Sequence, residues 1–113
     1  MTTVTIPGNP TPKGRPRHTK GGHTYTPRQT REAEAIIGWR YRQAGGAHHD
    51  GEVAVAVHYV MATHRRVDID NLIKLTLDGL NGFAYKDDAQ VTRIEASKEV
   101  GAEPSTSITI TAL

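Results

Sequence analysis

Several acidic residues in one central segment of the chain have a spacing that favours metal binding. Asp68 and Asp70 are separated by a single residue, so both side chains would point the same way from an extended backbone. Like charges held close together repel, and folding alone gives no reason to gather them. A hard divalent cation removes the conflict, because Mg²⁺ is held by one or two carboxylates, waters and the phosphate oxygens of a substrate. The pair therefore predicts a magnesium-type site.

A second acidic pair, Asp87-Asp88, follows a predicted helix and a turn containing glycine, immediately before the next predicted strand. We expect the fold to bring this pair back beside Asp68 and Asp70. Lys74 comes four residues after Asp70, so on a helix it lies next to that carboxylate and could contact a scissile phosphate or its leaving oxygen. Such a site would hold one or two metals, activate a water and neutralise charge developing on a phosphate.

Each of these residues also has a simpler interpretation. Asp68 or Asp70 could only cap a helix, since Asp is a favoured N-cap residue. Lys74 could only pair with Asp70 and Asp78 across helical turns. Asp87-Asp88 could be turn residues and nothing more. Taken together, these interpretations do not explain why carboxylates return around one lysine and one strand end.

The elements that must position these residues are predicted to form one α+β domain spanning residues 1–113. Hydrophobic periodicity predicts the order β-α-β-α-β-β and a mixed sheet packed by helices. The segment 52–62 has two largely apolar faces, so we expect a central strand covered on both sides. The link 101–104 is short enough to join the last two strands, 92–100 and 107–113, as a hairpin.

Capping residues and apolar stripes indicate two helices, and an edge strand is expected at 3–7. The first helix is predicted to begin with Thr26 at its N-cap and Pro27 at its first position, and to end at Gly45. The second carries an apolar stripe over 72–80. The core side of the first helix is predicted to carry Ala33, Ile36, Ile37, Arg40, Tyr41 and Ala44.

Basic residues are concentrated in the first part of the chain. The net charge is only +2, but no acidic residue precedes Glu32. The segment 8–26 is rich in Pro, Gly, Lys, Arg and His and is predicted to be a long, mobile loop. We expect this loop and the outer face of the first helix to contact phosphates, although a disordered arm and a solvated helix face are simpler alternatives. The candidates for phosphate contact are Lys13, Arg15, Arg17, Arg28, Arg31 and Arg42.

The composition excludes several classes of site. The chain has no cysteine, which excludes disulfides, thiolate metal sites and a cysteine nucleophile. The sequence has no apolar run long enough to cross a membrane and no apolar block like that of a signal peptide. We therefore expect a cytoplasmic protein with no membrane partner.

The acidic segments together resemble the motifs of a known family. In order along the chain these are Asp68-Ile-Asp70-Asn71, Lys74, Asp78-Gly-Leu-Asn81-Gly82 and Asp87-Asp88-Ala-Gln90-Val91. They resemble the RusA family of Holliday junction resolvases, which are often carried by phages and prophages. Pro7-Gly8 and Pro12-Lys13-Gly14-Arg15-Pro16-Arg17 look like the opening segment of that family. The resemblance covers most of the chain and joins two separated motifs in the right order.

The resemblance implies a role for each acidic residue. Asp68, Asp70 and Asp88 would be the catalytic aspartates that bind the metal, and Lys74 would be the catalytic lysine. Asp87 would lie beside the metal without being one of these ligands. The family further implies Mg²⁺ as cofactor, with Mn²⁺ as a possible substitute, and no small-molecule cofactor. It also implies paired nicks across a four-way DNA junction during recombination and repair, so the basic candidates for phosphate contact would bind junction DNA.

The resemblance also implies a homodimer, and symmetry supports this independently. Resolving a junction needs two cuts, whereas the chain has a single acidic cluster, so two copies related by a two-fold axis would match the substrate. Two other functions remain open at this point: a DNA-binding module without catalysis, and a nuclease that acts more broadly on branched DNA.

Overall fold

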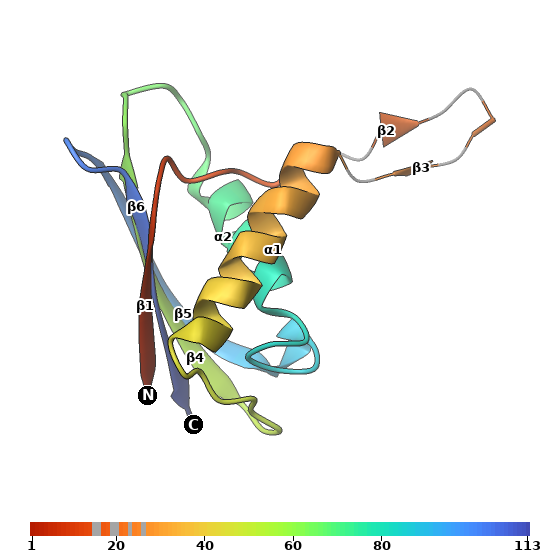
Figure 1. Ribbon diagram of the computed structural model, residues 1–113, viewed down its shortest axis with the longest axis vertical. Helices are drawn as coiled ribbons and strands as arrows, with labels where there is room; N and C mark the ends of the chain where they lie inside the picture. The colour runs from red at the N-terminus through yellow and green to blue at the C-terminus, as the bar shows by residue number, and fades with distance from the viewer. Residues whose placement is uncertain (15–16, 19–20, 23, 26) are drawn as a thin grey trace.

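The chain folds around one four-stranded sheet that carries two helices on one face (Figure 1). The structure is a computed structural model that describes residues 1–14, 17–18, 21–22, 24–25 and 27–113. The α+β class and the order β-α-β-α-β-β of the main elements are as predicted. The elements are β1 (Thr2–Pro7), β2 (Arg17–His18), β3 (Thr24–Tyr25), α1 (Arg28–Gln43), β4 (Val53–Met61), α2 (Ile69–Leu80), the 3₁₀ helix η1 (Asp88–Gln90), β5 (Val91–Val100) and β6 (Ser105–Ala112).

The sheet has the strand order β1-β6-β4-β5, with β4 and β5 parallel and the other neighbours antiparallel. Val57 of β4 lies opposite Ile108 of β6 on one side and opposite Ala96 of β5 on the other. Parallel neighbours need a crossover connection, and α2 provides it across one face of the sheet. The mixed sheet and the edge position of β1 are both confirmed.

The predicted hairpin between the last two strands is wrong. Because β4 lies between β5 and β6, residues 101–104 cross over the end of β4 instead of forming a tight turn. The Gly101 N–H donates to the Met61 carbonyl at 3.0 Å, and a Cβ at Gly101 would lie only 2.8 Å from Val60 Cγ1. A glycine therefore allows the link to pass close to the strand that it crosses.

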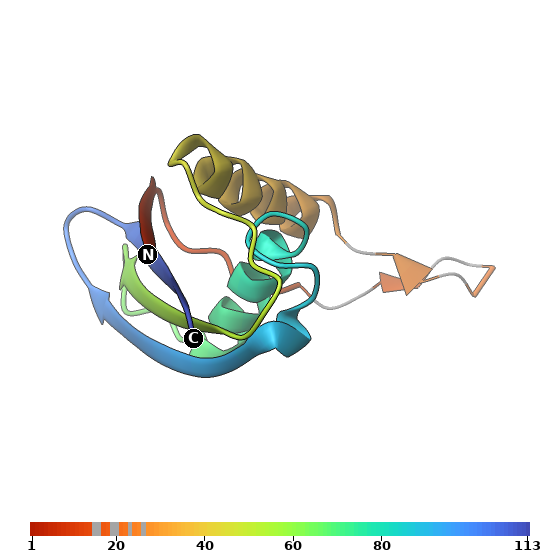
Figure 2. The same cartoon turned by 90° about the horizontal axis from the view of Figure 1, so that it is seen from below.

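The prediction that β4 is covered on both faces is also wrong. Alternate β4 side chains from Val53 to Met61 are buried beneath the helices, whereas those between them are only half-buried. Figure 2 shows both helices on the same side of the sheet. The open face carries polar side chains that hydrogen-bond across strands, such as Thr3 with Thr109 at 3.0 Å and His58 with Ser97 at 2.6 Å. The alanines of β4 on this face are apolar but small, so leaving them uncovered costs little.

α1 differs from its prediction in two details. It begins at Arg28 with Pro27 as the N-cap, one residue later than expected, and the predicted N-cap Thr26 lies outside the described residues. Ile36, expected in the core, is 50% exposed, whereas Ile37 and Tyr41 are buried as predicted. Gly45, which has a φ of +79°, follows the C-cap and ends the helix as predicted.

The segment predicted as a mobile loop packs against the helices where its first part is described. The Lys13 N–H donates to the Asn71 carbonyl at 2.9 Å, and the Gly14 N–H donates to Thr30 Oγ1 at 3.1 Å. Through these contacts, residues 9–14 form a strap across α1 and α2. Further along, β2 and β3 pair as a short antiparallel ribbon that projects from the body of the molecule (Figure 1).

Candidate active site and DNA-binding surface

Asp68 and Asp70 lie where the chain leaves the sheet and enters α2. Asp68 is the N-cap residue of α2, and Asp70 lies in its first turn. Both residues are largely accessible to solvent, and the Asp68 carboxylate accepts no capping hydrogen bond within the part of the chain that the structure describes. The simple N-cap interpretation therefore fails for its side chain. The positive end of the helix dipole favours negative charge at both positions.

The loop that carries Asp68 is tied to β5. The Lys98 ammonium donates a hydrogen bond to the carbonyl of Val67, the residue before Asp68. Because Lys98 is close to the end of β5, this contact holds the first acidic pair near the C-terminal end of that strand.

The second acidic pair is held by a turn that Gln90 closes. Asp87 caps η1: its side chain accepts a hydrogen bond from the Gln90 N–H, and Gln90 Oε1 accepts one from the Asp87 N–H at 3.2 Å. Gln90 Nε2 also donates to the carbonyls of His49 at 2.8 Å and Gly51 at 2.9 Å. Asp87 therefore has a structural role, and Gln90 positions Asp88. The spacing Asp-x-x-Gln is the sequence signal for such a reciprocal cap.

Asp88 lies in a field of negative charge. Its partial burial, a hydrogen bond with Asp87, and the charges of Asp87 and Asp78 together raise the pKa of Asp88, while the positive charge of Lys74 opposes them. Lys74 is thus close enough to act on Asp88, as well as being one helical turn from Asp70. The neighbouring carboxylates therefore disfavour the ionised form of Asp88.

The two acidic pairs lie at opposite ends of α2 in one chain (Figure 1). Asp78, whose charge acts on Asp88, is eight residues further along α2 than Asp70, or about 12 Å along the helix axis. Within the described part of the chain, no three His, Cys, Asp or Glu side chains come close enough to hold a metal ion. A single chain therefore brings Lys74 close to each acidic pair but does not bring Asp88 beside Asp68 and Asp70.

A groove of about 1040 Å³ opens beside Asp68, between the 9–14 strap, the start of α1 and the loop that follows β4. Arg65, Arg66, Asp68 and Asn71 line it. The two arginines are exposed and close in sequence to the first acidic pair, so they present positive charge beside it. Neither arginine was predicted as a DNA contact, although two consecutive arginines just before the Asp-x-Asp motif are a visible signal.

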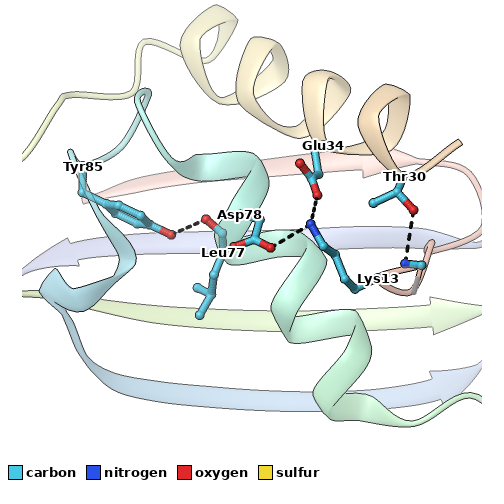
Figure 3. A network of polar contacts seen from close by, with 7 residues as sticks. Lys13, Thr30, Glu34, Leu77, Asp78 and Tyr85 are labelled. Carbon is cyan, nitrogen blue, oxygen red and sulfur yellow. Dashed lines mark hydrogen bonds and ion pairs between the residues drawn. The ribbon is translucent and has the colours of Figure 1, made fainter. Parts of the chain in front are cut away.

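Lys13, predicted to bind DNA, forms ion pairs within the protein (Figure 3). Its ammonium lies 2.5 Å from Glu34 Oε1 of α1 and 2.9 Å from Asp78 Oδ2 of α2, and its side chain is 19% exposed. Burial lowers the pKa of Lys13, but the hydrogen bonds and charges of Glu34 and Asp78 outweigh this and raise it above its ordinary value. Lys13 therefore links the strap to both helices, and its charge is largely neutralised.

The sequence profile of the endodeoxyribonuclease RusA family matches residues 7–111. The chain belongs to the RusA family. A search of curated proteins found no match. The matched range includes both acidic pairs, Lys74 and the arginine-lined groove, so these features belong to an endodeoxyribonuclease, a hydrolase that cleaves phosphodiester bonds within DNA chains.

The remaining predicted DNA contacts of this RusA-family nuclease have different environments. Arg28 pairs with Glu32 at 2.8 Å on the surface, and Arg31 is exposed. The Arg42 guanidinium lies over the rings of Trp39 and Phe83. Arg15 lies outside the described residues, as does the side chain of Arg17. None of the helices in the described ranges is both long and apolar enough to span a bilayer.

Proposed function

We propose that this RusA-family protein resolves four-way DNA junctions by divalent-metal-dependent hydrolysis of two strands. The observation that carries the proposal is the pair of accessible carboxylates, Asp68 and Asp70, at the start of α2 beside an arginine-lined groove in a chain of this family. The resemblance of its motifs favours a role in DNA recombination and repair in the bacterial cytoplasm, with phage or prophage origin.

The chemistry of the donor set fits a magnesium ion. Asp68, Asp70 and Asp88 would hold it, because carboxylate oxygens are the donors that Mg²⁺ prefers, and the same set would accept Mn²⁺. When bound, such an ion activates water and neutralises phosphate charge. Lys74 supplies a fixed positive charge between the acidic pairs, where it stabilises the charge that develops on the leaving oxygen. Arg65 and Arg66 orient the DNA backbone in the groove.

We further propose that two copies of the chain assemble each metal site. β5 is an edge strand, and Ile94 and Val100 on its helix side are 44% and 40% exposed. A long edge strand with exposed apolar side chains favours pairing with another chain. If two β5 strands pair antiparallel about a two-fold axis, the start of one β5 meets the end of the other.

Such pairing would bring together acidic residues that lie far apart within one chain. Asp88 lies in η1, directly before β5, whereas the Lys98 contact with Val67 ties Asp68 near the end of β5. The Asp88 of one copy would therefore approach Asp68 and Asp70 of the other. Two equivalent sites related by a two-fold axis would suit the two cuts that junction resolution requires.

The proposed function is tested by cleavage of a labelled mobile four-way junction in Mg²⁺, with binding measured separately. We expect symmetric paired nicks by the native protein, loss of nicking with retained binding in Asp70→Asn, and normal nicking in Asp50→Asn, a matched change at an exposed carboxylate in the loop before β4. Full activity of Asp70→Asn would refute the site.

Two other results would identify a different function. Binding of the junction without nicking, in Mg²⁺ and in Mn²⁺, would indicate a non-catalytic DNA-binding module. Equal cleavage of junction, flap and single-stranded DNA would indicate a nuclease of broader substrate range. Linear duplex serves as the common control in both comparisons.

A further inference from the structure

The outer face of α1 carries an exposed aromatic residue among arginines. At 3.6 residues per turn, Trp39 falls on the same side of α1 as Arg28, Arg31 and Arg42, opposite the buried Ile37. Trp39 is 53% exposed, and an indole of that size is normally covered when it serves only packing. This face therefore needs an explanation beyond the stability of the fold.

Trp39 is held in a defined orientation by its neighbours. Its ring meets that of Phe83 edge to face, with centroids 5.5 Å apart and planes at 67°. The Arg42 guanidinium carbon lies 5.5 Å from the Trp39 centroid and 5.4 Å from the Phe83 centroid. Gly38 makes room for the Phe83 ring, because a Cβ at that position would lie 2.3 Å from it. The result is a preformed pair of aromatic rings with the planar Arg42 guanidinium lying over them.

We propose that Trp39 and Phe83, flanked by Arg42, form a stacking site for an unpaired base of the DNA substrate. Aromatic rings stack on the faces of bases, and arginines beside them hold the backbone phosphates. The charge of this face fits DNA, since Glu32 is paired with Arg28 while Arg31 and Arg42 remain exposed. The inference rests on the proposed function, because the ligand is the DNA that the nuclease cuts.

The location of the stacking site agrees with this role. Phe83 is four residues before Asp87, so their Cα atoms lie within about 14 Å of each other along the chain. A base that leaves its stack beside the cleaved phosphate would thus find the aromatic surface within reach.

The chain offers a direct probe, because Trp39 is its single tryptophan. The fluorescence of the native protein would be titrated in EDTA with single-stranded DNA, with a four-way junction and with continuous duplex of the same sequence. We expect strong quenching by single-stranded DNA and by the junction, and little by the duplex, because only unpaired bases can stack on the indole.

Variants give a second, independent readout. We expect Trp39→Ala to weaken binding of single-stranded DNA by roughly 5- to 150-fold, the range for loss of one stacked base, and Trp39→Phe to restore most of it. Ile36→Ala is the matched control, because Ile36 is a 50% exposed apolar residue of the same helix that does not belong to the aromatic pair. Its affinity for DNA should equal that of the native protein.

The possible outcomes separate this inference from the proposed function. A junction that is bound and cut without any change in Trp39 emission would overturn the stacking site and leave the nuclease function standing. Equal quenching by duplex would also overturn it, as would emission that changes with protein concentration alone, which would mark the face as a contact between copies. Failure to bind or cut any DNA would overturn both.

Discussion

Replacing Lys13 with methionine tests whether the strap over the helices is part of the folded core. The substitution keeps most of the aliphatic stem but removes the ammonium that lies 2.5 Å from Glu34 and 2.9 Å from Asp78. Two carboxylates would then face each other, each with a side chain only about a fifth exposed (21%).

The expected cost follows from the strength of these contacts. A hydrogen bond to a charged group contributes about 1.5–3 kcal/mol, and breaking a buried pair by removing one partner costs about 3–5 kcal/mol. Since the three side chains retain some exposure, we expect Lys13→Met to lower the free energy of unfolding by about 3 kcal/mol. Urea unfolding followed by circular dichroism at neutral pH would measure it.

Arg28→Met is the matched control for this change. Arg28 and Glu32 also form an ion pair, at 2.8 Å, but their side chains are 84% and 60% exposed. Exposed pairs typically contribute about 0–1 kcal/mol, so the control should change stability little. Adding Asp78→Asn to Lys13→Met should recover part of the stability, because it removes the repulsion that the first change creates. Equal, small effects of Lys13→Met and Arg28→Met would refute the internal role of Lys13.

Three further predictions concern the turn, the groove and alkaline pH. In Gln90→Glu the new side chain cannot donate hydrogen bonds to the carbonyls of His49 and Gly51, so Asp88 should shift. Junction cleavage should slow by roughly 10- to 100-fold while junction binding is retained, and Gln43→Glu is the control at an exposed position. Changing Arg65 and Arg66 to glutamine should reduce the slope of log affinity against log salt by about 1 for each phosphate that an arginine no longer neutralises. Burial raises the pKa of Tyr59 to about 12 from 10.0, so the folded state keeps a proton that the unfolded state loses. Tyr59 alone should therefore lower stability by about 2 kcal/mol between pH 10 and 12. Tyr59→Phe should reduce the alkaline loss of stability by about that amount, while Tyr85, whose pKa is also raised by burial, keeps its own contribution.

Local patterns predicted the elements well because each one depends on neighbouring residues. The apolar alternation from Val53 to Met61 and the stripe over 72–80 correspond to β4 and α2. Strand pairing was harder, because two strands adjacent in the chain usually pair, yet β4 lies between β5 and β6. The second face of β4 was predicted to be covered because its alanines are apolar, but side chains this small tolerate an open face.

The site was predictable only in part for a similar reason. The acidic pairs, Lys74 and the family could be recognised from residue types and spacing, and the family is confirmed. Other features depend on contacts between segments that are distant in the sequence. They are the internal pairing of Lys13 with Glu34 and Asp78, the hydrogen bonds of Gln90 to the loop before β4, and the placement of the acidic pairs at opposite ends of α2. No local pattern encodes such contacts.

The most direct test of the shared active site is the activity of a mixed dimer. Asp70→Asn and Asp88→Asn chains with different tags would be co-expressed, and the heterodimer purified and given a labelled four-way junction in Mg²⁺. If each site combines Asp68 and Asp70 of one copy with Asp88 of the other, one site of this heterodimer carries no substitution. A heterodimer of Asp70→Asn with Asp68→Asn has no such site and is the control. We predict single nicks by the first heterodimer and none by the control or by either mutant homodimer, whereas an inactive first heterodimer would contradict the account.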